Sequence, residues 1–229
     1  MKKFGFTLAE TLITLGIIGI VAAMTIPNLI TEHQKRTSVT KLQRAISVIN
    51  QAYRLSFDEV GEATKEEAFE MGVDEYFKKY WAPYIKVLNT CSSYQACGYK
   101  TAIPFKHPNR TISSWMVVDK SRRATFYTMD GFLYIIFIAA NGETIAAAER
   151  KILVDINGSS APNQFGKDVF ILTRVEKDGG GVRPFGYEKT DEEIKNNCSK
   201  SYYNNIAGFM CAERIRRAGW KIDNNYPWK

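Results

Sequence analysis

The sequence predicts an α+β fold in which one long N-terminal helix packs on an antiparallel β-sheet. Residues 11–31 carry no charge, and an amphipathic stripe of helical period follows them. From residue 115 onward the chain changes to short apolar runs separated by tight turns, which is typical of antiparallel strands. These observations place a long helix before a sheet in chain order.

Composition limits the class of protein. The chain has 229 residues, of which 45% are hydrophobic and 24% charged, and its net charge is +7. These values are ordinary for a folded chain, so intrinsic disorder is excluded. Two histidines leave little room for a multi-histidine metal centre, and four cysteines are too few for a disulfide-dense miniprotein.

The uncharged run is long enough to cross a bilayer, because a helix rises ~1.5 Å per residue and the hydrocarbon core is ~30 Å thick. A secretory signal peptide is the alternative, with Lys2 and Lys3 as its basic region. It fits poorly, because its apolar core should span only ~7–15 residues. Glu10 also places a carboxylate near the start of the run, which is costly and usually functional.

A recognisable motif surrounds Glu10. Residues 2–10 are Lys-Lys-Phe-Gly-Phe-Thr-Leu-Ala-Glu, and they resemble the processing motif of type IV pilins and type II secretion pseudopilins. The resemblance is strong over residues 1–57 and weaker beyond. It implies that prepilin peptidase cuts between Gly5 and Phe6, and that Phe6 becomes an N-methylphenylalanine. Glu10 would then pair with the terminal amine of a neighbouring subunit, since a buried unpaired carboxylate costs several kcal/mol.

The resemblance also implies partners and a location. The chain is expected in the bacterial inner membrane as a single-pass protein, with its head outside the cytoplasm and the basic leader inside. Expected partners are the lipid bilayer, prepilin peptidase, the inner-membrane assembly platform, and copies of itself or other pilin-like subunits. The assembled product is a periplasmic or extracellular filament.

Small residues share one face of the apolar helix. Gly16, Gly19 and Ala23 either let subunits pack closely in a filament or are the ordinary small-residue content of a membrane helix. Pro27 removes a backbone donor and is expected to break or bend the helix.

We expect four parts in the chain. Residues 1–5 are the leader, 6–30 the transmembrane and filament-core helix, 31–60 its amphipathic half, and 61–229 a globular head with a disulfide-stapled tail. The helix should span residues 6–57. Basic residues around its amphipathic half face solvent or another subunit, or contact lipid headgroups. The apolar stripe steps by three and four residues: Val39, Leu42, Ile46, Ile49 and Tyr53.

Beyond residue 61 the pattern predicts more helix and then strands. An aromatic-rich stripe over residues 69–88 indicates a second helix, interrupted near Pro83, which packs in the core or forms a binding surface. Residues 178–181 are expected to be a flexible turn, and residues 191–219 have broken helical patterning. Strands are predicted at 115–118, 124–128, 132–140, 143–148, 151–156 and 169–175, with turns at 129–131 and 141–142.

The four cysteines lie in the part expected outside the cytoplasm, where disulfides can form. Four cysteines allow three pairings, and we expect the local one, Cys91 with Cys97 and Cys198 with Cys211. The alternative is a four-cysteine zinc site, although neither spacing is that of a zinc knuckle.

An oxygen-rich loop follows residue 154. Asp155, Asn157, Asn163 and Asp168 surround two glycines, and such hard oxygen ligands suit Ca²⁺. Some pseudopilins, which the chain resembles, carry calcium in a C-terminal loop. The alternative is an Asx-rich turn whose side chains bond their own backbone. Apart from this possible calcium, no cofactor is expected.

The sequence shows no catalytic constellation, so we expect no enzyme. The favoured function is a structural subunit of a type IV filament system, either a type II secretion pseudopilin or a minor pilin. The alternative is a pilin that binds DNA or a surface, for which basic and aromatic groups lie near the tail: Tyr202, Tyr203, Arg214, Arg216, Arg217 and Lys221. An anchored periplasmic enzyme is a third and weaker alternative.

Overall fold

The computed structural model describes residues 5, 7–61, 63, 65–113, 122–138, 151–175 and 180–228. The chain divides into two compact units, of which the first ends at Thr37 and the second begins at Ser38. The boundary lies within one continuous helix, α1 (Leu8–Val60), so each unit contains part of that helix.

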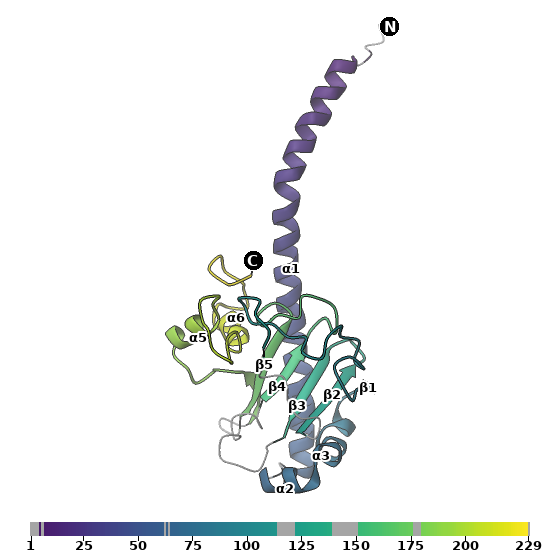
Figure 1. Ribbon diagram of the computed structural model, residues 1–229, viewed down its shortest axis with the longest axis vertical. Helices are drawn as coiled ribbons and strands as arrows, with labels where there is room; N and C mark the ends of the chain where they lie inside the picture. The colour runs from purple at the N-terminus through teal and green to yellow at the C-terminus, as the bar shows by residue number, and fades with distance from the viewer. Residues whose placement is uncertain are drawn as a thin grey trace. The chain divides into compact units, whose positions relative to one another are not determined.

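The second unit has α+β architecture, as predicted. All neighbouring strands are antiparallel and follow one another in chain order, β1 to β6, so the described sheet is a simple meander (Figure 1). After α1 come α2 (Lys65–Met71), α3 (Val73–Tyr80), the 3-10 helix η1 (Ala82–Tyr84), β1 (Val87–Thr90), β2 (Arg123–Thr128), β3 (Leu133–Phe137), β4 (Lys151–Asp155), β5 (Val169–Val175), β6 (Gly181–Pro184), α5 (Asp191–Asn197) and α6 (Cys211–Arg217).

One face of α1 packs on the sheet. Leu42, Ala45 and Ile49 are completely buried, as the helical spacing of the apolar residues predicts. Burying a leucine or isoleucine side chain contributes ~1.5–3 kcal/mol to stability. Two hydrogen bonds join the sheet to specific positions of α1. The Tyr134 hydroxyl donates to the Ala45 carbonyl at 3.0 Å, and the Val182 amide donates to Asn50 Oδ1 at 2.8 Å.

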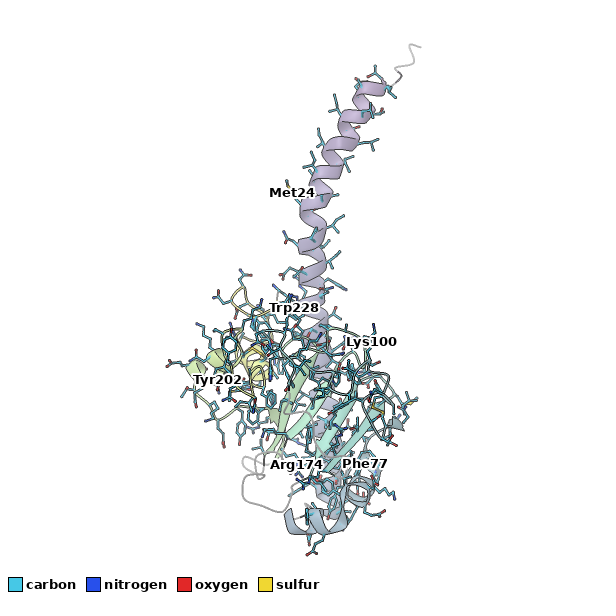
Figure 2. All side chains as sticks on the ribbon, in the orientation of Figure 1. Met24, Phe77, Lys100, Arg174, Tyr202 and Trp228 are labelled. Carbon is cyan, nitrogen blue, oxygen red and sulfur yellow. A yellow bond between two sulfur atoms is a disulfide. The ribbon has the colours of Figure 1, made fainter. Side chains whose placement is uncertain are left out.

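The short helix α3 extends this core at one end of the sheet. Phe77 packs on Phe126 of β2 with ring centroids 4.8 Å apart. The Arg174 guanidinium of β5 donates to the Tyr76 hydroxyl at 2.9 Å. Figure 2 shows Phe77 and Arg174 at the same end of the sheet. The aromatic stripe of residues 73–80 is therefore core, which was one of its two expected uses.

The opposite face of the sheet is buried as well. Leu133, Ile135, Phe137, Leu153 and Ile171 alternate with the helix-facing residues and form a second core. Loop side chains cover this face, and they are mainly aromatic: Tyr94, Tyr99, Phe105, Phe165 and Phe209. Strands β3 and β4 are consequently buried along their whole length, unlike a sheet with one face in solvent.

Several boundaries differ from prediction. The expected second helix divides at Gly72, whose φ is +78°, and ends at η1, so Leu88 lies in strand β1 rather than on a helical stripe. Strand β6 begins at Gly181, where a turn was expected. The Gly181 backbone approaches α1 so closely that a Cβ would lie 2.8 Å from Asn50 Oδ1. Helix α1 ends at Val60 instead of residue 57.

Other predictions fall outside the described residues. These are the strands at 115–118 and 143–148, the turn at 141–142, the end of the strand at 132–140, and the first half of the turn at 178–181.

Candidate functional site

The first turn of α1 is closed by a reciprocal hydrogen-bond pair. The Thr7 amide and the Thr7 hydroxyl both donate to Glu10 Oε2 at 2.8 Å, and the Glu10 amide donates to Thr7 Oγ1 at 3.3 Å. This is a capping box, in which the N-cap threonine and the glutamate three residues later satisfy each other's orphan donors. The Thr-x-x-Glu spacing of Thr7 and Glu10 is a sequence signal for this cap, which Glu10 forms in addition to its expected intersubunit role.

The expected cleavage site adjoins this cap. Gly5 is exposed, and nothing lies within 4 Å of where its Cβ would be. Phe6 lies outside the described residues, so the cut between Gly5 and Phe6 and the methylation of Phe6 remain predictions.

The first unit exposes a large apolar surface. Ile13 is 62% exposed, Ile18 63% and Met24 70%, and α1 is long and apolar enough to cross a membrane (Met24 in Figure 2). Exposed apolar surface of this extent marks contact with lipid or with another protein. Gly16, Gly19 and Ala23 are also exposed, and a Cβ built on either glycine would meet nothing within 4 Å.

Helix α1 continues on both sides of Pro27, so the break that was one of the two expected effects of this proline does not occur. A proline removes only one backbone donor, which a long helix can tolerate. The hydroxyls of nearby threonines donate to backbone carbonyls one turn earlier in the helix. The Thr25 hydroxyl donates to the Val21 carbonyl and the Thr31 hydroxyl to the Pro27 carbonyl, both at 2.9 Å. Such back-bonding suits polar side chains in lipid.

The cysteines pair locally, which is the expected pairing. Cys91 bonds Cys97 with Cα atoms 5.4 Å apart, and the Tyr127 hydroxyl donates to the Cys97 carbonyl, which holds this loop against β2. Cys198 bonds Cys211 with Cα atoms 4.9 Å apart, and both are completely buried. The second disulfide joins the end of α5 to the start of α6.

The structure brings the four oxygen-bearing residues of the β4–β5 loop together. Asp155 and Asp168 lie at the facing ends of β4 and β5, where the Ile156 amide donates to the Asp168 carbonyl at 2.8 Å. Asp155 accepts from the Tyr99 hydroxyl at 2.8 Å and from the Asn157 amide at 3.2 Å. Asp168 accepts from the Asn163 and Gln164 amides at 2.8 and 2.7 Å. These carboxylates therefore organise the loop backbone, as in an Asx-rich turn.

Two observations show that the buried polar groups of this cluster are incompletely satisfied. Burial, with the nearby Asp168 carboxylate, raises the pKa of Asp155 well above its ordinary value, and burial raises the pKa of Asp168 to about 6. The side-chain oxygens of Asn157 and Asn163 are buried, and no described residue donates a hydrogen bond to them. Among the described residues, no group of three or more His, Cys, Asp or Glu side chains could hold a metal ion.

The arginines of the tail do not form a free basic surface. Arg216 and Arg217 both bond the completely buried Glu213, at 2.7 and 2.8 Å, and Arg217 also bonds Asp191 at 2.6 Å. Arg214 donates to the Cys198 carbonyl at 2.9 Å. These side chains hold α5 and α6 together, whereas Tyr202 and Tyr203 lie in a separate loop and Lys221 follows α6 (Tyr202 in Figure 2).

Two sequence families match the chain. Residues 1–26 match the prokaryotic N-terminal methylation motif, which shows the prepilin-type motif and makes this a type IV pilin-like protein. The motif and the apolar helix are consistent with a membrane-anchored structural protein that assembles with pilin-like subunits after cleavage by prepilin peptidase. No curated protein and no solved structure matches the chain. Residues 28–229 match a family of unknown function, DUF6613, over most of the chain, and the chain therefore belongs to that family.

Proposed function

We propose that this protein is a structural subunit of a type IV filament system, either a type II secretion pseudopilin or a minor pilin. One observation carries the proposal: the methylation motif leads directly into an exposed apolar helix whose first turn contains Glu10. A simple membrane anchor needs no carboxylate there, because an acidic group in lipid is costly.

The proposed cycle follows from the two environments of the helix. After cleavage behind Gly5, the helix stays in the bilayer until assembly moves it into a filament core. Both environments remove the apolar side chains from water. Each Å² of apolar surface that is covered contributes ~25 cal/mol of favourable free energy. Gly16, Gly19 and Ala23 permit close approach of neighbouring helices in the core.

Mass spectrometry of the N-terminus tests the processing step. The chain is produced with and without a prepilin peptidase, and the new terminus is sequenced. We expect a terminus at Phe6 carrying one methyl group, obtained only with the peptidase. Gly5→Leu is expected to stop cleavage, because the resemblance implies a small residue there, and Gly19→Ala is the matched control. A terminus created within residues 20–30 would instead indicate a cleaved signal peptide.

Deletion in the native host separates the two named filament types. Retention of secreted proteins in the periplasm is expected for a secretion pseudopilin, whereas loss of surface filaments is expected for a minor pilin. A defect only in DNA uptake or surface attachment would favour the alternative of a binding pilin. The internal bonds of Arg214, Arg216 and Arg217 weaken that alternative, because these cations already have partners within the head.

We further propose that the loop of residues 155–168 accepts Ca²⁺. The ligand set fits this ion, because it consists of hard oxygens and includes two buried amide oxygens, from Asn157 and Asn163, that accept no hydrogen bond from the described part of the chain. Bound Ca²⁺ would supply the positive charge that the buried carboxylates of Asp155 and Asp168 lack, and would hold the β4–β5 loop.

A further inference from the structure

A shallow polar pocket lies where two loops of the second unit meet. Its volume is about 220 Å³, and its lining comes from residues 107–112 and 202–207. The side chains that matter here are aromatic or amide-bearing: Asn109, Tyr202, Tyr203, Asn204 and Asn205. Because drug-sized pockets are ~300–1,000 Å³, this pocket suits a ligand about the size of one sugar ring.

The floor of the pocket is held in place. His107 is only 6% exposed, and its Nδ1 lies 3.0 Å from the Ala207 carbonyl. The side-chain amide of Gln164 donates to the Pro108 carbonyl at 2.9 Å. At Gly208, whose φ is +87°, a Cβ would lie 2.8 Å from the Pro108 ring, so the two loops are in close contact. A fixed floor reduces the entropy cost of binding.

The rim presents unused groups. The Tyr203 side chain is 81% exposed, and among the described residues neither its hydroxyl nor the Asn205 amide has a hydrogen-bond partner. Asn109 Oδ1 accepts from Thr111, and Asn204 Oδ1 accepts from the Ile206 amide. The side-chain N–H₂ group of each asparagine is a further hydrogen-bond donor.

Positive charge lies beside this rim. Arg110 belongs to the same turn as Asn109, and its amide donates to the His107 carbonyl at 2.8 Å. Lys200 precedes Tyr202 by two residues, and both cations are exposed. Each cation therefore adjoins one of the two chain segments that line the pocket.

We propose that this pocket binds an acidic sugar, a pyranose unit that bears a carboxylate. The C–H face of the ring packs on Tyr203, its hydroxyls accept hydrogen bonds from the asparagine amides, and its carboxylate is attracted by Arg110 and Lys200. A nucleic acid needs a continuous basic track along its backbone, which the internally bonded arginines of α6 do not supply. This inference is independent of the filament role.

Titration of the full chain in detergent micelles tests the site. Methyl β-glucuronide is the probe, and methyl β-glucoside, which lacks the carboxylate, is its neutral counterpart. We expect saturable binding of the glucuronide that is at least about fivefold tighter than that of the glucoside. Tyr203→Ala should weaken the binding of both sugars about tenfold, while Tyr203→Phe keeps the ring and the affinity. Lys200→Gln should weaken only glucuronide binding.

Two controls make the outcomes decisive. Lys79→Gln removes an exposed cation from α3, on the helix side of the sheet, and should leave both affinities unchanged. Absence of glucuronide binding, or equal loss with Lys79→Gln and Lys200→Gln, overturns the proposal. Tighter binding of an oligothymidylate that displaces the sugar and depends on Tyr203 also overturns it, in favour of a nucleic-acid site.

Discussion

The carboxylate of Glu10 is bonded within its own chain by Thr7, through both the backbone amide and the hydroxyl of that residue. Both bonds use Oε2, so Oε1 has no partner among the described residues and can receive the terminal amine of another subunit. Capping and assembly are therefore compatible uses of one side chain. The cap also keeps the carboxylate from being an unsatisfied group at the helix terminus.

Glutamine at position 10 separates these two uses. Glu10→Gln keeps a capping box, because glutamine also serves at this position, but it removes the charge. We expect Glu10→Gln and Glu10→Ala to insert and be processed normally, and both to lower the filament yield by at least about tenfold. Sheared filaments, quantified against total membrane-bound subunit, give the measurement.

Glu32→Gln is the matched control for this substitution. Glu32 is also exposed on α1, where it pairs with Lys35 at 2.7 Å, and its loss should leave the yield unchanged. If Glu10→Gln assembled as well as wild type while Glu10→Ala did not, the cap alone would account for the need for this side chain in assembly. The proposed ion pair between subunits would then be contradicted.

The disulfide Cys198–Cys211 is expected to stabilise the head more than Cys91–Cys97. It closes the longer loop, 13 residues against 6, and it joins α5 to α6, which are also linked by the ion pair between Arg217 and Asp191. Replacing Cys198 and Cys211 by serine should lower the free energy of unfolding by ~3 kcal/mol. Urea titration of the full chain, compared with the Cys91 and Cys97 double variant, is the measurement. An equal or smaller loss for the Cys198 and Cys211 variant contradicts the expectation.

Local patterns predicted three parts of the protein well. The membrane run, the apolar stripe through Leu42 and Ile49, and the β2–β3 hairpin all depend on residues close together in the sequence. The Thr7–Glu10 cap has an equally local signal in its Thr-x-x-Glu spacing.

What the sequence did not predict depends on distant contacts. Strand β6 follows a glycine pair and forms because Gly181 fits against Asn50 of α1, some 130 positions earlier. The second core was missed because its covering loop, with Tyr99 and Phe105, has no periodic pattern. One signal was present: β3 is continuously apolar and β4 is apolar at its three central residues, 152–154, which indicates strands buried on both faces.

The buried Asp168 predicts an unusual pH dependence. Its pKa is about 6 in the folded chain because of burial, against an ordinary 3.8. Between these values the folded chain keeps a proton that the unfolded chain has lost. The contribution of Asp168 to stability should therefore fall as pH rises from about 4 to about 6 and change little above that.

Asp168→Asn isolates this contribution. The difference in free energy of unfolding between wild type and variant, measured in EDTA, should change across this window by on the order of 2 kcal/mol. Asp58→Asn, which removes an exposed carboxylate from α1, controls for the loss of one negative charge. A difference that stays constant between pH 4 and pH 7 would show that Asp168 gains no protonation on folding.

Calcium should reverse this effect, because the ion binds the deprotonated carboxylates that burial disfavours. At pH 7, adding Ca²⁺ at a hundred times its Kd should stabilise the full chain by ~2.7 kcal/mol, seen as a higher Tm. Below about pH 5 the gain should shrink, since protons compete for Asp155 and Asp168. Asn157→Ala removes one of the two unpartnered amide oxygens and should weaken the response, whereas Asn225→Ala, on an exposed turn, should not. An unchanged Tm with Ca²⁺ at pH 7 means that the four residues serve only to bond their own loop.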